Sequence, residues 1–142
     1  MKVLVDTSIW SLALRRHGSQ LNKNELINLD ELKELINESR AIIIGPIRQE
    51  ILSGISSHDQ FIALKEKLSY FSDIVITTND YELAAELFNT CRRKGVQGSH
   101  IDFLICALSI NQEFSIYTLD KDFMRYMNYC NIKLHDPRAY KK

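Results

Sequence analysis

The chain has 142 residues, which suits a single domain large enough to bury a hydrophobic core. Its 45% hydrophobic and 25% charged residues are typical of a soluble globular protein and argue against a disordered or membrane-embedded chain. Because 18 basic residues balance 18 acidic ones, the sequence lacks the positive excess of bulk nucleic-acid binders, and any anionic substrate must be held locally.

The sequence predicts a cytoplasmic protein. No apolar stretch is long enough to span a bilayer, and Asp6 interrupts the apolar run that could otherwise resemble a signal peptide. The three cysteines form no C-x-x-C pair and are predicted to be reduced thiols. The four histidines lie far apart and suit no zinc-binding spacing.

The first half of the chain is expected to alternate strands with helices. Compact apolar runs predict strands, and apolar residues at helical intervals predict amphipathic helices. The expected strands are residues 2–5 and 41–44. The expected helices are residues 8–16, 24–38, 46–54 and 58–70. Ser8 would cap the first of them, and Gly18 would end it in a polar loop. Pro46 would begin the third.

The second half continues this alternation. The expected strands are residues 73–76, 114–118 and, more weakly, 132–134. Three helices are expected: residues 79–94, a helix that begins at Ser99 and buries residues through Leu108, and residues 121–127. In the first of these, Asn79 and Glu82 stand in the N-cap and N3 positions. Such alternation predicts one α/β domain over residues 1–142, with helices on both faces of a mostly parallel sheet.

Four acidic residues are expected to gather at one edge of this sheet. Asp6 follows the first strand and Asp120 follows the strand 114–118. Glu50 lies about one turn inside the helix that leaves the second strand, and Asp102 lies in the first turn of its helix. The carboxyl ends of parallel strands form the binding edge, so four carboxylates there would repel one another unless a hard cation such as Mg²⁺ or Mn²⁺ joined them.

Each acid also has a simpler interpretation. Asp6 could cap the helix that follows it, and Asp102 could form half of a capping box with Ser99. Glu50 could be an ordinary solvated residue, and Asp120 with Asp122 could favour the first turn of a helix. Taken singly these interpretations are the better ones, but together they require four acids to meet at the functional edge by accident.

Four segments carry these acids: VLVDTS at 3–8, IRQEILSG at 47–54, HIDFLICA at 100–107 and YTLDKDF at 117–123. Together they resemble the acidic signatures of PIN-domain nucleases, in the order and spacing of VapC-type toxins of toxin–antitoxin pairs. The resemblance implies a three-layer α/β/α fold whose mostly parallel sheet has about four to five strands. It implies a catalytic quartet of Asp6, Glu50, Asp102 and Asp120, with Asp122, Thr7 and Thr118 as candidate helpers.

The resemblance further implies an endoribonuclease that uses Mg²⁺ or Mn²⁺. Asp6, Asp102 and Asp120 are the expected metal ligands, and Glu50 would bind a second ion or position the attacking water. Arg15, Arg48 and Lys121 are candidate contacts to RNA phosphates, with Arg16 beside them. The expected partners are RNA, a small VapB-type antitoxin and a second copy of the chain, with no membrane involved.

Two other functions fit parts of the sequence. A non-catalytic PIN-like module that binds RNA or protein is disfavoured because no acid of the set is missing. A receiver-type phosphoacceptor domain would carry a phosphorylatable Asp after the third strand, where this chain has Thr77 and Thr78, and paired acids after the first strand, where only Asp6 stands.

Overall fold

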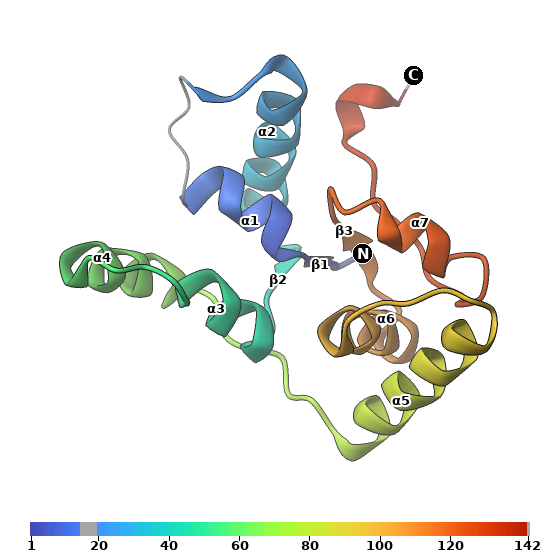
Figure 1. The fold of residues 1–142 in the computed structure, drawn as a ribbon. Helices are drawn as coiled ribbons and strands as arrows, with labels where there is room; N and C mark the ends of the chain where they lie inside the picture. Colours follow the sequence, from blue (N-terminus) through green and yellow to red (C-terminus); the bar gives the residue numbers. More distant parts are fainter. Residues whose placement is uncertain (15–19, 142) are drawn as a thin grey trace.

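The computed structural model describes residues 1–14 and 20–141, and it has the α/β fold that the sequence predicts (Figure 1). Its regular strands are parallel and lie in the order β2-β1-β3. These strands are β1 (Val3–Val5), β2 (Ala41–Ile42) and β3 (Ser115–Tyr117). The central strand β1 is buried along its whole length, as expected of a parallel strand with neighbours on both edges.

Two further segments extend the sheet by one parallel bridge each. Asp73 pairs with Ile43 beyond β2, and Leu134 pairs with Ile116 beyond β3. The described residues therefore form three regular strands, where about four to five were expected. The run 73–76 leaves the sheet after its single bridge, and Val75 is 79% exposed, so its β-branched residues do not build a buried strand.

The first four helices are α1 (Thr7–Leu14), α2 (Lys23–Asn37), α3 (Gly45–Leu52) and α4 (His58–Leu68). The first helix begins at Thr7, one residue before its expected start, because the backbone carbonyl of Asp6 accepts the amides of Ile9 and Trp10 at 3.0 and 3.2 Å. Ser8 therefore lies inside α1 and is not its cap. The expected end of this helix at Arg16, with Gly18 after it, lies outside the described residues.

The later helices are α5 (Thr78–Arg93), α6 (His100–Gln112) and α7 (Asp122–Tyr126), followed by a short 3-10 helix at Arg138–Tyr140. The predicted cap of α5 was wrong: the capping box is formed by Thr77 and Asp80, whose carboxylate accepts the Thr77 amide at 2.8 Å. The cap of α6 is Ser99, as predicted, and its hydroxyl accepts the Asp102 amide at 3.0 Å.

Figure 1 shows the strands at the centre of the molecule, with α1 to α4 on one side and α5 to α7 on the other. The helices α5 and α6 are joined by the short loop 94–99 and pack against each other. Trp10 and Phe103 are among the largest fully buried side chains of the core. Along the parts of the chain that the structure describes, no helix has the length and apolar character required to cross a membrane.

Candidate acidic site

Asp6 lies where β1 ends and α1 begins, and two hydroxyl groups hold its carboxylate. Ser8 Oγ donates to Asp6 Oδ2 at 2.9 Å, and Thr118 Oγ1 donates to the same oxygen at 2.7 Å. The backbone amide of Asp6 donates to the carbonyl of Tyr117 at 2.9 Å. The ends of β1 and β3 therefore fix this carboxylate together, although they lie more than a hundred residues apart in the chain.

The turn after β3 is tied to the same hydroxyls. Thr118 Oγ1 accepts the amide of Asp120 at 2.9 Å, and Ser8 Oγ accepts the amide of Leu119 at 3.0 Å. Asp120 Oδ1 in turn accepts the amide of Asp122 at 2.9 Å. One network of hydrogen bonds thus sets the backbone of Asp120 relative to Asp6.

Asp102 comes from α6, and its charge interacts with both of these acids. Its Oδ2 accepts a hydrogen bond from the Tyr126 hydroxyl at 2.7 Å. Burial raises the pKa of Asp102, and the negative charges of Asp120 and Asp6 raise it further, whereas the hydrogen bonds from Tyr126 and Ser99 oppose the rise. Two of the other predicted acids, Asp6 and Asp120, therefore lie close enough for their charges to act on Asp102.

Tyr126 is a site residue that the sequence did not reveal. Its ring packs against Phe103 and Phe123, with ring centroids 4.8 and 5.2 Å away, so its hydroxyl reaches Asp102 from within the core. Burial and the bond to Asp102 raise the pKa of the Tyr126 hydroxyl. A Cβ atom at Gly98 would collide with this hydroxyl and lie 2.9 Å from Phe103, so the glycine leaves the space that Tyr126 occupies.

Among the described contacts, the side chains of three other predicted residues form no hydrogen bond with Asp6, Asp102 or Asp120. Glu50 is exposed on α3, and the described part of the chain provides no hydrogen bond or ion pair to its side chain. Asp122 is 50% exposed and lies 3.8 Å from Arg125. Thr7 directly follows Asp6 in the sequence. Its hydroxyl is buried, and no other described residue offers it a hydrogen-bond partner.

The candidate phosphate contacts have different environments. The guanidinium of Arg48 donates to Asp73 Oδ1 at 2.9 Å, to the carbonyl of Leu68 at 2.8 Å and to the carbonyl of Phe71. These bonds favour a structural role for Arg48, which ties α3 to the segment after α4. Lys121 is exposed in the turn before α7. Arg15 and Arg16 lie outside the described residues.

The PIN domain family model matches residues 3–128, which is most of the chain. The chain belongs to the PIN domain family. No curated protein is similar enough in sequence to match it.

Solved structures share the fold of this PIN domain at low sequence identity. FitAcB from Neisseria gonorrhoeae is 18% identical, with a TM-score of 0.72 over 95% of this chain and 97% of that one. VapBC2 from Rickettsia felis, bound to a DNA fragment from its promoter, is 20% identical, with a TM-score of 0.69 over 95% and 98%. DNA-bound VapBC from Salmonella typhimurium is 14% identical, with a TM-score of 0.69 over 96% and 98%.

The acidic residues of the PIN domain fit a hard divalent cation. Oxygen atoms of carboxylates are the ligands that Mg²⁺ selects, and Mg²⁺ commonly uses only one or two carboxylates while retaining several waters. Among the described residues no three acidic, His or Cys side chains converge as a complete ligand set, so bound water would have to fill the remaining positions. Burial is the main reason that the pKa of Asp102 is raised, and the charges of Asp120 and Asp6 add to it; a cation would offset both.

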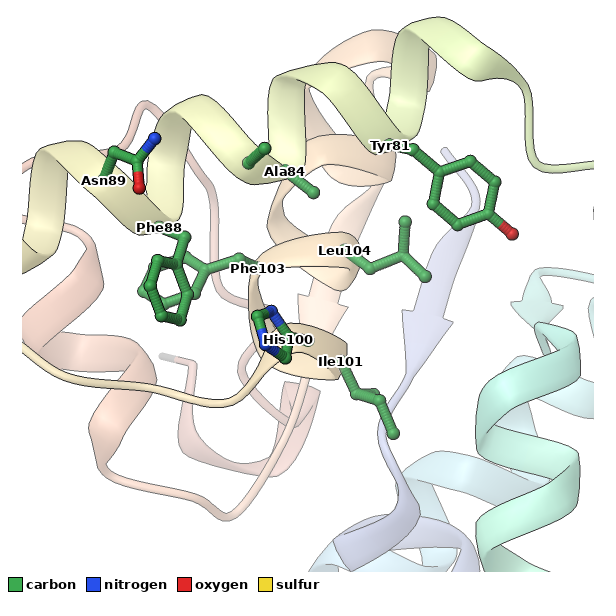
Figure 2. Close-up of a pocket in the computed structure, with 9 residues that line it drawn as sticks. Tyr81, Ala84, Phe88, Asn89, His100, Ile101, Phe103 and Leu104 are labelled. Carbon is green, nitrogen blue, oxygen red and sulfur yellow. The ribbon is translucent and has the colours of Figure 1, made fainter.

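A separate groove of about 380 Å³ lies between α5 and α6 (Figure 2). It begins at the first turn of α6, where His100 stacks on Phe88 with ring centroids 5.0 Å apart. None of the four predicted acids, Asp6, Glu50, Asp102 and Asp120, lines this groove. The lining residues are Tyr81, Ala84, Ala85, Phe88, Asn89, His100, Ile101, Phe103 and Leu104.

Proposed function

We propose that this PIN domain is a Mg²⁺- or Mn²⁺-dependent endoribonuclease and the toxin of a toxin–antitoxin pair. The observation that carries the proposal is the set of Asp6, Asp102 and Asp120: Thr118 bonds to both Asp6 and Asp120, and the charges of these two acids add to the burial that raises the pKa of Asp102. A metal-dependent nuclease uses such carboxylates to hold a divalent cation against an anionic phosphodiester.

Asp6 and Asp102 are the principal metal ligands in this proposal, and Asp120 completes the shell through a metal-bound water, because no three such side chains of the described residues converge on one ion. A bound divalent ion supplies a water of lowered pKa and stabilises negative charge on the leaving oxygen of the phosphodiester. Glu50, which is exposed on α3, holds a second ion or positions the attacking water.

The surrounding side chains position these acids. Ser8 and Thr118 hold one oxygen of Asp6, and the other oxygen would bind the metal ion. Tyr126 holds one oxygen of Asp102 in the same way. Such hydrogen bonds to ligating carboxylates are worth about 10–100-fold in metal affinity or activity. Thr7 is a further candidate, because its buried hydroxyl has no partner among the described residues and could bond to a metal-bound water.

Lys121 is the described cation best placed to bind an RNA phosphate, because it is exposed and directly follows Asp120. Arg15 remains a candidate from the sequence alone. Single-stranded RNA is the proposed substrate, since its bases and phosphates are accessible without opening a duplex.

The proposed protein partners are a small VapB-type antitoxin and a second copy of the chain, and the proposed location is the cytoplasm. Support for the antitoxin comes from the similarity in fold to FitAcB and to the VapBC structures. Support for the homodimer comes from the sequence resemblance to VapC-type toxins and from the neutral net charge, because two copies could build one shared positive groove.

Cleavage of single-stranded RNA by the purified chain tests the nuclease. We expect cleavage with Mg²⁺, none with a chelator, and none in the Asp6→Asn variant, whereas Asp30→Asn, an exposed acid on α2, should cleave like the parent. Equal rates for Asp6→Asn and the parent would exclude the proposed site. Calorimetry that detects Mg²⁺ binding without cleavage of any RNA would favour a non-catalytic module.

Expression in cells with and without the adjacent reading frame tests the assignment as a toxin. We expect growth arrest by the chain alone, rescue by the neighbour, and new RNA 5′ ends at a dominant site. Arrest that persists unchanged in Asp6→Asn would mean that toxicity does not come from the acidic site.

A further inference from the structure

Three cysteine thiols meet in the core, one of them a helical turn from Asp102 on α6. Cys91 comes from α5, Cys106 from α6, and Cys130 from the segment after α7. All three are free and buried, and Cys91 Sγ lies 3.7 Å from Cys130 Sγ. Nothing in the proposed nuclease reaction uses them.

We propose that Cys130 and Cys91 form a modification site at which a hydroperoxide oxidises the two thiols to a disulfide. A disulfide bond is about 2.05 Å long, so the two sulfur atoms at 3.7 Å have to approach by about 1.7 Å in total. Cys130 lies outside the regular helices, in a bend of the chain, so its backbone is less constrained than that of Cys91 within α5.

The three thiols are not equivalent in reactivity. Hydrogen bonds from Cys106 and Cys91 lower the pKa of Cys130 to about 7, although burial opposes this. Burial raises the pKa of Cys91 to about 11, and its contact with Cys130 adds to the rise. Cys130 is also the only one of these three with measurable exposure, at 4%. Thiolate character and access favour oxidation, so Cys130 reacts first.

The oxidation proceeds in two balanced steps. The Cys130 thiolate attacks one peroxide oxygen, the O–O bond breaks, and the products are a sulfenic acid and hydroxide. The Cys91 sulfur then attacks the Cys130 sulfur, the S–O bond breaks, and the thiol proton leaves with the hydroxyl group as water. In total two thiols lose two electrons and two protons, and one hydroperoxide is reduced.

The disulfide would close a loop that contains functional residues. Residues 91–130 include α6 with Asp102, the turn with Asp120, and α7 with Tyr126. The amide of Cys130 donates to the carbonyl of Tyr126 at 2.8 Å, so the new bond would attach directly to the turn that ends α7. A link to control of the nuclease rests on the proposed function, whereas disulfide formation itself does not.

Treatment of the full chain with hydrogen peroxide, followed by alkylation of free thiols in denaturant, tests the site. We expect an intact mass two hydrogens lower, one alkylated cysteine instead of three, and a bridged peptide pair containing Cys91 and Cys130. Dithiothreitol should restore three free thiols. The Cys91→Ala and Cys130→Ala variants should lose the bridge. Cys106→Ala should still form it, but more slowly, because it removes the hydrogen bond that lowers the pKa of Cys130 most.

Several results would overturn the proposal. These are three alkylated cysteines after oxidation, a bridge that contains Cys106, or a bridge between two chains. If a variant fails to fold, the peptide map of the oxidised parent decides the pairing by itself. The measurement needs no RNA or metal, so a failure of the disulfide and a failure of the nuclease are separate outcomes.

Discussion

Two carboxylates of this PIN domain lie in opposite electrostatic environments: Glu31 is buried on α2, and Asp102 is half-buried on α6. Burial would raise the pKa of Glu31, but hydrogen bonds from Arg138 and His135 lower it below its usual value. The two contacts are short: Arg138 Nε lies 2.8 Å from Glu31 Oε1, and His135 Nε2 lies 2.8 Å from Glu31 Oε2. Asp102 receives only neutral hydrogen bonds and faces two acids, and its pKa is raised.

The difference separates a structural acid from a candidate ligand. Glu31 joins α2 to the C-terminal segment, and the cations that compensate it belong to the same chain. No basic side chain of the described residues forms an ion pair with Asp6, Asp102 or Asp120. Charges removed from water are normally paired, so the environment of Asp102 is consistent with the proposed cation, which stays a prediction.

The largest expected effect is that of Asp102→Asn on RNA cleavage. A metal ligand contributes several kcal/mol of charge stabilisation in the transition state, so we expect the rate to fall by about 10³-fold or more. The asparagine oxygen can still accept from Tyr126, and the repulsion by Asp120 and Asp6 is removed. Chemical denaturation without metal should therefore show a free energy of unfolding at least equal to that of the parent.

Glu31→Gln is the matched control for that variant, because it neutralises the other of these two carboxylates. It should cleave RNA at the rate of the parent. If Asp102→Asn destabilised the metal-free protein while cleavage stayed intact, Asp102 would be a structural acid like Glu31.

Tyr126→Phe should give the next largest effect. It removes the hydroxyl that holds Asp102 and keeps the ring that packs in the core. We expect cleavage to fall by about 10–100-fold and the Mg²⁺ concentration for half-maximal rate to rise. Measured Mg²⁺ dependence distinguishes this positioning role from a loss of stability alone.

Tyr117→Phe is the corresponding control for Tyr126→Phe. Tyr117 is also buried, but its hydroxyl donates to the carbonyl and side-chain oxygen of Asn28, at 2.9 and 2.8 Å. Its removal should lower stability and leave the Mg²⁺ dependence unchanged. A similar shift in Mg²⁺ dependence in both variants would contradict a specific role for Tyr126.

Glu31→Gln should lower stability without changing the site. Hydrogen bonds to charged groups contribute about 1.5–3 kcal/mol each, and an amide keeps only part of them, so we expect a loss of about 1–3 kcal/mol at neutral pH. Urea unfolding of the variant and the parent measures it. An unchanged free energy of unfolding would mean that the ion pairs of Glu31 do not stabilise the fold.

The two environments also predict opposite pH dependences. The pKa of Glu31 is lowered from 4.5, so its contribution is present above pH 4.5 and is lost as the pH falls through the folded-state pKa. The pKa of Asp102 is raised from 3.8, so stability falls as the pH rises from 3.8 through its folded-state pKa. The free energy of unfolding of the parent, Glu31→Gln and Asp102→Asn, measured without metal as a function of pH, should show the two trends. If the curves of the three proteins ran parallel, the two acids would not differ in this way.

Sequence reasoning located the edge at which Asp6, Asp102 and Asp120 lie near one another, because each follows a strand end or begins a helix. Their role as metal ligands stays a prediction. Tyr126 could not be found in this way, since its contact with Asp102 depends on how α7 packs on α6 and on the space left by Gly98.

Two misplaced elements show where local patterns fail. The segment from Thr77 to Glu82 holds two overlapping capping patterns, and the one used is that of Thr77 and Asp80, since Asp80 is also bonded to Asn111 of α6 at 2.8 Å. The run 73–76 has strand composition, but it pairs with the sheet only at Asp73. Tertiary contacts decide both cases, and they are not visible in a local window of sequence.

The smallest expected effect is that of Asp122→Asn, which tests how far the acidic site extends. Asp122 is half exposed, and its contact with Arg125 at 3.8 Å is a surface ion pair. Surface pairs contribute about 0–1 kcal/mol, so both stability and cleavage should stay near those of the parent.

Asp120→Asn should instead lower cleavage as Asp102→Asn does, because the Asp120 charge acts on Asp102 directly. If cleavage fell more in Asp122→Asn than in Asp120→Asn, the last acid of the set would be Asp122, and the metal site would extend onto α7.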